Sequence, residues 1–253
     1  MNRLIIFRKW IQTFFFLVSS TLLFLLINNI LLVIHKLCPY SVICFGTMSL
    51  KYGQVIYPLT LVLSTLLTFS VIWFGRWFCG YICFIGTIQE WIYRLFHKKC
   101  QPYVNINKID EKRLGFLKYL ILLFTIVMAF IGLSHVYMNF CPVMAIGWIK
   151  SIRLPGIITL TLIVIGSAFI ERLWCRFLCP YAALMNLLAF VGKSFNINSF
   201  QLKRNYETCI DCGICCKACP MNIDLLEQEV IDNPNCIKCY RCVQRCPKKG
   251  SLK

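Results

Sequence analysis

Two cysteine runs decide the fold of the C-terminal part of the chain: Cys209-Ile-Asp-Cys212-Gly-Ile-Cys215-Cys216-Lys-Ala-Cys219-Pro220 and Cys236-Ile-Lys-Cys239-Tyr-Arg-Cys242-Val-Gln-Arg-Cys246-Pro247. Both follow the spacing C-x2-C-x2-C-x3-C-P. With this spacing three thiolates can wrap one cube of iron and sulfide, and the fourth, before proline, reaches across to another cube. The two interleaved copies therefore predict two [4Fe-4S] clusters.

The spacing also assigns each cysteine to a cluster. The first set is Cys209, Cys212, Cys215 and Cys246, and the second is Cys236, Cys239, Cys242 and Cys219. A zinc ribbon is the alternative, but zinc takes four ligands, and two interleaved runs with trailing prolines exceed that need. Cys216 fits no ligand position and is expected to be a small buried side chain. About 45 residues cannot build a large core, so the clusters themselves must stabilise this domain.

The composition of the whole chain indicates a membrane protein. Of its 253 residues, 58% are hydrophobic and only 15% are charged, with a mean hydropathy of +0.68. A soluble domain is typically about half apolar and about a quarter charged. Small secreted disulfide scaffolds also contain many cysteines, but they are shorter and less apolar than this chain with its 17. Disordered, collagen-like and nucleic-acid-binding chains fit badly, and no nucleic-acid partner is expected.

Four apolar stretches are predicted to cross the membrane in contact with lipid, because about 20 helical residues span a bilayer core. They cover residues 10–34, 55–74, 114–134 and 152–170. The first resembles a signal peptide in having basic residues before it. However, its apolar run is too long for a signal sequence, and no small-residue cleavage site follows.

The basic residues predict the orientation of these spans. If the N-terminus is inside, 23 of the 27 Lys and Arg residues lie in inner segments, and the outer loops hold only Lys36, Lys51, Lys150 and Arg153. The positive-inside rule then places both termini in the cytoplasm and explains most of the net charge of +17. The predicted fold is mainly α. Residues 1–195 form a four-helix transmembrane anchor of two tandem hairpins, and residues 206–253 form a cytoplasmic two-[4Fe-4S] ferredoxin domain.

An internal repeat supports the two hairpins. The inner ends of the second and fourth spans share R-x-x-C-x3-C at an offset of 96: Arg76-Trp-Phe-Cys79-Gly-Tyr-Ile-Cys83 and Arg172-Leu-Trp-Cys175-Arg-Phe-Leu-Cys179. The outer ends of the first and third spans carry Cys38-Pro39 and Cys141-Pro142. Four landmarks in the same order indicate a duplication, with the hairpins related by a pseudo-two-fold axis along the membrane normal.

Paired ferredoxin runs after four spans, with C-x3-C-P at the inner helix ends, resemble the NapH-type membrane component of periplasmic nitrate reductase systems. Related polyferredoxin-like quinol dehydrogenases share this plan, and the resemblance covers nearly the whole chain. Cys179 is followed by Pro180 as in that pattern, whereas Cys83 is followed by Phe84. The resemblance implies electron transfer between the quinone pool and redox partner proteins, such as a reductase complex. It also implies the inner membrane of a bacterium or archaeon.

The inner cysteines have two interpretations. Cys79 and Cys83, like Cys175 and Cys179, are four residues apart, so each pair shares one helix face. The pseudo-two-fold axis can bring both pairs together as four thiolates for a further cluster or a dithiol relay. Alternatively, they are small residues that allow close helix packing.

Other features have weaker predictions. Cys38 and Cys141 can form a disulfide, bind metal or fix a turn, and no role is assigned to Cys44. His35 and His135 are expected to lie at the membrane interface, with quinone contact as the alternative. Residues 84–96 are predicted to form an interfacial amphipathic helix. Besides quinone-linked electron transfer, two functions stay open: an assembly or maturation factor that delivers electrons to thiols or a metal, and a redox-sensing membrane regulator.

Overall fold

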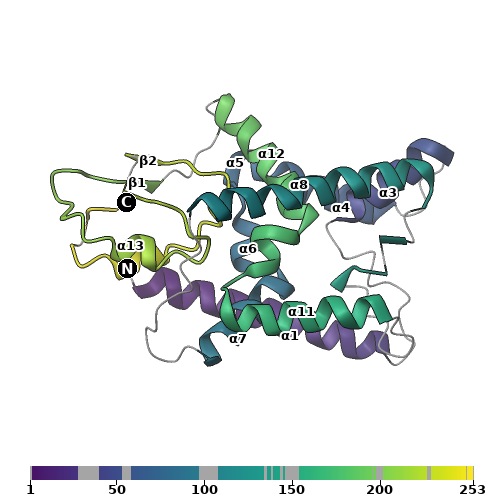
Figure 1. The fold of residues 1–253 in the computed structure, drawn as a ribbon, viewed down its shortest axis with the longest axis horizontal. Helices are drawn as coiled ribbons and strands as arrows, with labels where there is room; N and C mark the ends of the chain where they lie inside the picture. The colour runs from purple at the N-terminus through teal and green to yellow at the C-terminus, as the bar shows by residue number, and fades with distance from the viewer. Residues whose placement is uncertain are drawn as a thin grey trace.

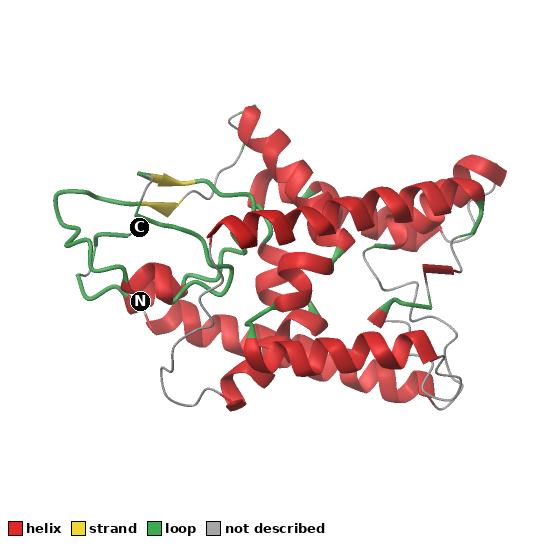
Figure 2. Cartoon of the chain, in the orientation of Figure 1, coloured by secondary structure: helices red, strands yellow, loops and turns green. Residues whose placement is uncertain are grey.

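The computed structural model describes residues 2–27, 40–52, 58–96, 108–133, 136–137, 139–142, 145, 154–195, 197, 202–226, 229–248 and 250–252, most of them helical (Figure 2). The longer helices are α1 (Asn2–Ile27), α3 (Ser41–Tyr52), α4 (Pro58–Phe69), α7 (Phe84–Phe96), α8 (Lys108–Ile131), α11 (Leu154–Phe169) and α12 (Pro180–Ser194). The short ones are α5 (Val71–Phe74), α6 (Trp77–Tyr81), the π-helical segment η2 (Trp174–Leu178), α13 (Ile214–Lys217) and α14 (Arg241–Arg245).

The predicted spans coincide with helices, but only one described helix is long and apolar enough to cross a membrane unaided. That segment is Asp110–Ile131 in α8. The helices over the second and fourth predicted spans, Pro58–Phe74 and Leu154–Phe169, are apolar but shorter. Helix α1 covers the first span as far as Ile27, and the rest of that span lies outside the described residues. The four-span anchor therefore stays a prediction.

The helical part consists of the two copies of the repeat, and helices of each copy pack against helices of the other. Helix α7, which follows the first C-x3-C motif, packs against α11 of the second half, and α12, which follows the second motif, packs against α5 of the first half. Figure 1 shows α8, α4 and α12 on one side and α1, α7 and α11 on the other, with α6 between them. This packing places the two C-x3-C motifs at the centre of the molecule.

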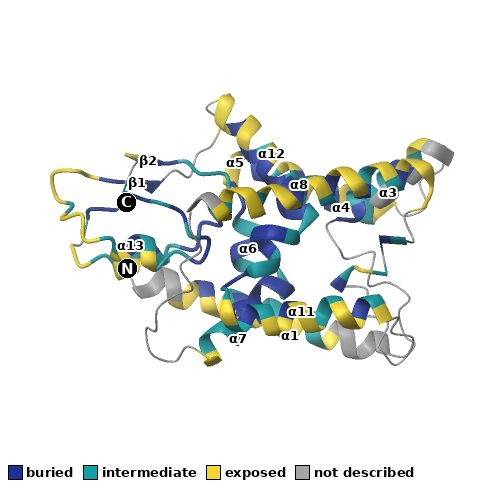
Figure 3. Cartoon of the chain, in the orientation of Figure 1, coloured by how far each residue is buried: buried dark blue, intermediate teal, exposed yellow. Residues whose placement is uncertain are grey.

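The helical part exposes apolar side chains and buries polar ones. Phe116, Leu123 and Phe130 on α8 are each about 60% exposed, as is Leu162 on α11. Figure 3 shows exposed residues along α1, α8 and α11, whereas the region around α6 is mostly buried. Soluble monomers rarely expose such large continuous apolar surfaces.

The ferredoxin-like part lies at one end of the helices, with both ends of the chain nearby (Figure 1). Its two short strands, β1 (Leu202–Lys203) and β2 (Val230–Ile231), pair antiparallel, with Leu202 opposite Ile231. Arg204 forms a further bridge with Leu252. Strand β1 precedes residue 206, so the chain packs into this unit a few residues before the predicted domain start.

Candidate iron–sulfur centres

Both cysteine runs have the same backbone conformation. Asp211 and Lys238, which precede the second cysteine of each run, have φ values of 51° and 52°. Gly213 and Tyr240, which follow that cysteine, have φ values of 69° and 56°. Turns that alternate right-handed and left-handed residues point successive N–H groups at one place and form anion-binding concavities, as at many Fe–S sites. Because positive φ is uncommon outside glycine, its repetition in both runs marks two equivalent cluster-binding loops.

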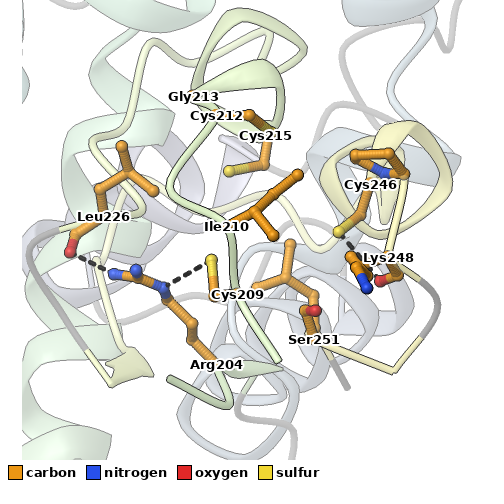
Figure 4. A pocket seen from close by; sticks show the side chains of 12 residues that line it. Arg204, Cys209, Ile210, Cys212, Gly213, Cys215, Leu226, Cys246, Lys248 and Ser251 are labelled. Atoms are coloured by element: carbon orange, nitrogen blue, oxygen red, sulfur yellow. Dashed lines mark hydrogen bonds between the residues drawn. The ribbon is translucent and has the colours of Figure 1, made fainter. Parts of the chain in front are cut away.

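The first predicted ligand set lines a single pocket (Figure 4). Cys209, Cys212 and Cys215 of the first run and Cys246 of the second are among the residues around a space of about 360 Å³. The chain thus brings the fourth cysteine across from the other run, which is the arrangement that interleaved ligation needs. Ligation of iron by these residues stays a prediction.

Arg204 borders this pocket and contacts one of the cysteines. Its Nε donates a hydrogen bond to Cys209 Sγ at 3.3 Å, and its Nη2 forms an ion pair with Asp211. Hydrogen bonds to ligand sulfurs are one means by which proteins tune the reduction potential of a cluster. Cys216 is not among the pocket residues, and its Sγ accepts a hydrogen bond from the N–H of Leu225 at 3.3 Å.

The second predicted set is more deeply buried. Its four thiols lie close enough for their charges to interact: Cys219, Cys236, Cys239 and Cys242. Burial raises the pKa of Cys219 to about 12, and the neighbouring thiols Cys239 and Cys236 add to this effect. Four thiolates can therefore be held here only around a cation. Within the described part of the chain, no three His, Cys, Asp or Glu side chains are placed to hold a single metal ion. Four cysteine thiolates are the donor set that a [4Fe-4S] cluster takes.

The second cysteine of each inner motif stands at the start of a helix. Cys83 precedes α7 and Cys179 precedes α12, and they accept hydrogen bonds from the backbone N–H groups of Gly86 and Ala182, respectively. A helix N-terminus favours a thiolate through its free N–H groups and its dipole. Phe84 does not prevent this arrangement, so Cys83 keeps the helix-start position of Cys179, although the first motif is α-helical and the second π-helical.

The structure brings the four inner cysteines together. Burial raises the pKa of Cys83 first, followed by the charges of Cys175, Cys79 and Cys179, so all four thiols lie near one another. Their other contacts repeat at the 96-residue offset. Cys79 Sγ is 3.6 Å from Met185 Sδ, and Gln89 Nε2 is 3.6 Å from Cys175 Sγ. The two motifs therefore form one four-cysteine centre with pseudo-two-fold symmetry, in which Cys79 and Cys175 are buried and Cys83 and Cys179 are half-buried.

Two buried arginines extend this symmetry. Arg172 donates to Glu90 Oε2 at 2.7 Å and to the Cys79 carbonyl oxygen at 2.5 Å. Its counterpart Arg76 donates to Asn186 Oδ1 at 2.9 Å, and Asn186 is the residue 96 positions after Glu90. Each motif thus binds the helix that follows the other motif.

Glu90 is the centre of a buried ionic network. Its Oε2 lies 2.7 Å from Arg8 Nη2 and 2.7 Å from Arg172 Nη2, and its Oε1 pairs with Arg94. Burial alone would raise the pKa of Glu90, but the guanidinium groups of Arg172, Arg8 and Arg94 outweigh it and hold the pKa well below its usual range. This network joins α1, α7 and the second motif.

The interfacial-helix prediction for α7 needs one correction. Gln89 and Glu90, the polar face, are fully buried and bonded to the protein, whereas Trp91, Leu95 and Phe96 are exposed. The polar face is buried because it binds the second motif, including the backbone N–H of Trp174. The helix is therefore a structural part of the four-cysteine centre.

Replacing Glu90 with Gln is expected to destabilise the protein by about 3 kcal/mol, because it leaves buried guanidinium groups without their counter-charge. The pKa of the native Glu90 carboxylate is lowered. Its contribution to the free energy of unfolding is therefore complete above the ordinary glutamate pKa of about 4, and it is lost as the pH falls well below that value. Acid unfolding of both proteins in detergent checks this, with exposed Glu207→Gln as the control. Equal stability of the Glu90 variant and wild type would contradict the role of the network.

The second cluster-binding loop is docked against the four-cysteine centre. A Cβ atom at Gly80 in α6 would lie 2.4 Å from the Ile237 carbonyl oxygen, so the two backbones are in direct contact. Asn235, which precedes Cys236, accepts hydrogen bonds from Lys118 Nζ at 2.7 Å and Asn186 Nδ2 at 2.8 Å. The loop therefore rests on α6, α8 and α12.

Gly80→Ala is expected to destabilise the protein by about 1–3 kcal/mol. The added methyl group would clash with the Ile237 carbonyl oxygen, and a backbone atom cannot move aside as the end of a flexible side chain can. The matched control is Gly115→Ala in α8, where a Cβ would meet no atom within 4 Å and helix propensity favours alanine. Thermal unfolding in detergent measures both. A Gly80 variant as stable as the control would show that the two backbones are not held in contact.

The sequence interpretation missed Asn235, Asn186, Glu90 and Arg8. Two signals pointed to them: Glu90 and Asn186 share the 96-residue offset of the cysteines, and Lys118 interrupts an apolar span. Cys38, His35, His135 and the side chain of Cys44 lie outside the described residues. Cys141 is half-buried, and the three alternatives for Cys38 and Cys141, a disulfide, a metal site or a turn, stay predictions.

Comparison with known proteins agrees with the repeat and the cluster motifs. A family described as a 4Fe-4S binding domain matches twice, at residues 55–101 and 152–198, which confirms the duplication. A second family, a 4Fe-4S dicluster domain, matches residues 201–247. The first family covers both inner C-x3-C motifs, and the second covers both C-terminal runs.

Several curated proteins are similar to this chain. YccM of Escherichia coli, named for electron transport, is 33% identical over 225 residues, covering 82% of this chain and 60% of YccM. An uncharacterised protein of Methanocaldococcus jannaschii is 29% identical over 254 residues, covering 98% of this chain and 94% of its own length. The regulatory protein NosR of Pseudomonas aeruginosa is 26% identical over 201 residues, 75% of this chain and 27% of NosR. No solved structure matches. The chain therefore carries 4Fe-4S binding domains of two described families, and it spans about 60% of the length of YccM.

Proposed function

We propose that this protein carries electrons in a membrane between the quinone pool and a redox partner protein. One observation carries the proposal: the loop of the second cluster rests directly on the four-cysteine centre, through Gly80 and Ile237. The three predicted centres then follow one another, from the pocket of Cys209 to the loop of Cys239 and on to the inner cysteines. Iron–sulfur clusters, when bound, supply one-electron transfer along this row.

The protein residues position and shield the centres. Arg172 contacts the Cys79 carbonyl oxygen, and its charge is also near Cys175 and Cys239, so it lies between the second loop and the four-cysteine centre. A buried guanidinium there offsets the negative charge that several thiolates bring. The surrounding helices bury Cys79 and Cys175, whereas Cys83 and Cys179 are half-buried.

The surface supports a membrane location. The exposed apolar faces of α1, α8 and α11 would contact lipid, and the buried Lys118 and Glu171 bond residues of the ferredoxin-like part, Asn235 and Arg241. This inverted distribution suits a protein whose helices lie in hydrocarbon, where exposed charge is costly. The positive-inside count then orients the ferredoxin-like part toward the cytoplasm.

The orientation has a direct test. A reporter fused after the C-terminus is expected to be active only in its cytoplasmic form, and an impermeant thiol reagent added to sealed cells should leave Cys209 unlabelled. Labelling after permeabilisation is the control. Labelling of Cys209 in sealed cells would mean that the orientation is inverted.

Electron transfer is tested with full-length, cluster-loaded protein in liposomes under anaerobic conditions. If electrons flow from quinol to the protein, a short-tail quinol is expected to bleach the iron–sulfur absorbance and to produce the EPR signals of reduced clusters. If they flow the other way, the matching quinone is expected to reoxidise the reduced protein. Lack of exchange in both directions would reject the quinone link while leaving the iron–sulfur assignment intact.

Redox sensing is the second candidate, because NosR, one of the relatives, is named a regulatory protein. A carrier passes many electrons per molecule to an artificial acceptor in the presence of excess quinol. A sensor accepts only the few electrons that fill its clusters. Counting the electrons transferred per molecule separates the two functions.

A further inference from the structure

Arg76 differs from the other buried arginines in having no counter-charge. Among the residues that the structure describes, every other buried arginine forms an ion pair with a carboxylate: Arg8, Arg172, Arg176 and Arg204. The completely buried Arg76 donates instead to two neutral amide oxygens, Asn186 Oδ1 at 2.9 Å and Asn235 Oδ1 at 3.4 Å. Its Nε and Nη2 have no acceptor in the described part of the chain. No described carboxylate therefore neutralises its charge.

The internal repeat shows which group is missing. Arg76 and Arg172 occupy the same position in the two copies, as do Glu90 and Asn186. Arg172 donates to the Glu90 carboxylate at 2.7 Å, and Arg76 donates to the Asn186 amide oxygen at 2.9 Å. An amide in place of a carboxylate keeps the hydrogen bond but supplies no negative charge. At this pair the pseudo-two-fold symmetry is therefore kept in the contacts and broken in the charge.

The charge of Arg76 acts on two of the predicted centres. Asn235, which accepts one of its hydrogen bonds, directly precedes Cys236 of the second cluster-binding loop. Burial raises the pKa of the Cys236 thiol, and the charge of Arg76 is among those that oppose this rise. The same opposition of burial and Arg76 applies to Cys175 and Cys179 of the second inner motif. Arg76 therefore lies between the second cluster-binding loop and the four-cysteine centre.

A buried cation without a carboxylate needs negative charge from another source. The other side chain that donates to Asn235 Oδ1 is also basic, Lys118, whose Nζ is 2.7 Å away. Thiolates that hold a cluster, and an electron added to that cluster, supply negative charge close to Arg76. Burial makes such an added charge unfavourable, and a fixed cation in the same poorly solvated region offsets this cost. A carboxylate paired with the arginine would cancel most of the effect.

We propose that Arg76, left without a counter-charge by Asn186, raises the reduction potential of the second C-terminal cluster and so holds the transferred electron in the middle of the row of centres. The inference deepens the proposed function by stating where the electron resides, and it does not depend on the quinone link. The cluster takes one electron from a neighbouring centre and later gives one electron up. No covalent bond and no proton changes at Arg76.

The test is a redox titration of full-length, cluster-loaded protein in detergent, with dithionite as reductant and EPR as the readout. Asn186→Asp places a carboxylate beside Arg76 with little change in shape. It is expected to lower the equilibrium constant for reduction of the second cluster at least tenfold, which is a fall of about 59 mV for a one-electron couple. Glu90→Gln makes the opposite change at Arg172, whose charge is near Cys239, and it should raise the same midpoint potential.

Two controls separate charge from structure. Asn186→Ser disturbs the same contacts without adding charge, and its midpoint should stay within twofold of wild type in equilibrium constant. The first C-terminal cluster is the internal reference and should keep its midpoint in all variants. A water-soluble dysprosium complex identifies that cluster by faster spin relaxation, because Cys212 is exposed whereas Cys239 and Cys242 are buried. Iron and sulfide content is measured first for each variant.

The outcomes decide between a charge effect and a structural role. An unchanged midpoint in fully loaded Asn186→Asp, or an equal fall in Asn186→Ser, would overturn the inference. If Asn186→Asp does not load its clusters, Glu90→Gln decides, and a midpoint that is unchanged or lowered in that variant would overturn it. Lack of quinol exchange in wild type would reject the proposed quinone link and leave these midpoints standing. Wild type without a second C-terminal cluster would overturn both.

Discussion

Replacing Cys212 or Cys239 with Ser is expected to remove one [4Fe-4S] cluster per chain and to unfold much of the ferredoxin-like part. The physical reason is that the described residues of this part form only two two-residue strands and two short helices, so the bound clusters must supply its stability. Serine cannot replace the soft thiolate that iron prefers. The measurement is iron and acid-labile sulfide per chain after anaerobic purification, with EPR of the reduced protein.

Cys216→Ser is the matched control for this prediction. Cys216 lies in the same run, but it is absent from the pocket lining and binds the Leu225 N–H instead. This variant should keep its full complement of iron and sulfide. Loss of equal iron in all three variants would contradict the assignment of ligands by spacing. Zinc without sulfide in the reconstituted wild type would reject the clusters altogether.

Replacing Cys79 or Cys175 with Ala is expected to lower quinol-linked electron transfer more than tenfold, with the C-terminal clusters verified intact. The four inner cysteines surround one centre, so each is needed for the whole, and the double variant should be no worse than either single variant. A packing role predicts the opposite, because alanine also permits close helix approach. Both motifs place their second cysteine at the start of a helix, so equal losses are expected.

A readout other than activity strengthens this test. If the centre holds a further cluster, iron and sulfide should fall by the same amount in the Cys79 and Cys175 variants, whereas Cys216→Ala should leave them unchanged. Near-wild-type transfer in both inner variants would reject the relay. A loss confined to Cys175→Ala would show that the first motif, with Phe84 after Cys83, has lost its role.

The cysteine runs show how much of the candidate site the sequence could predict. Their spacing encodes ligands that lie within a few residues of one another, and the chain does bring Cys246 to Cys209, Cys212 and Cys215. The 96-residue offset likewise predicted the paired motifs, and the twofold match of one family confirms it. The exact use of the inner thiols could not be predicted, because four-residue spacing suits both helix packing and ligation.

The sequence by itself determined the local features of this protein: apolar helices, an internal duplication and two cluster-binding runs. These follow from spacing and composition, which act over a few residues or one turn of a helix. Only the tertiary structure decided that Arg172 reaches Glu90 and that Gly80 meets Ile237. Those contacts join residues 82 and 157 positions apart in sequence. Such pairs depend on which faces of the helices pack together. A helix that is apolar on all sides does not show in its sequence which face is buried, so these contacts could not be predicted from composition.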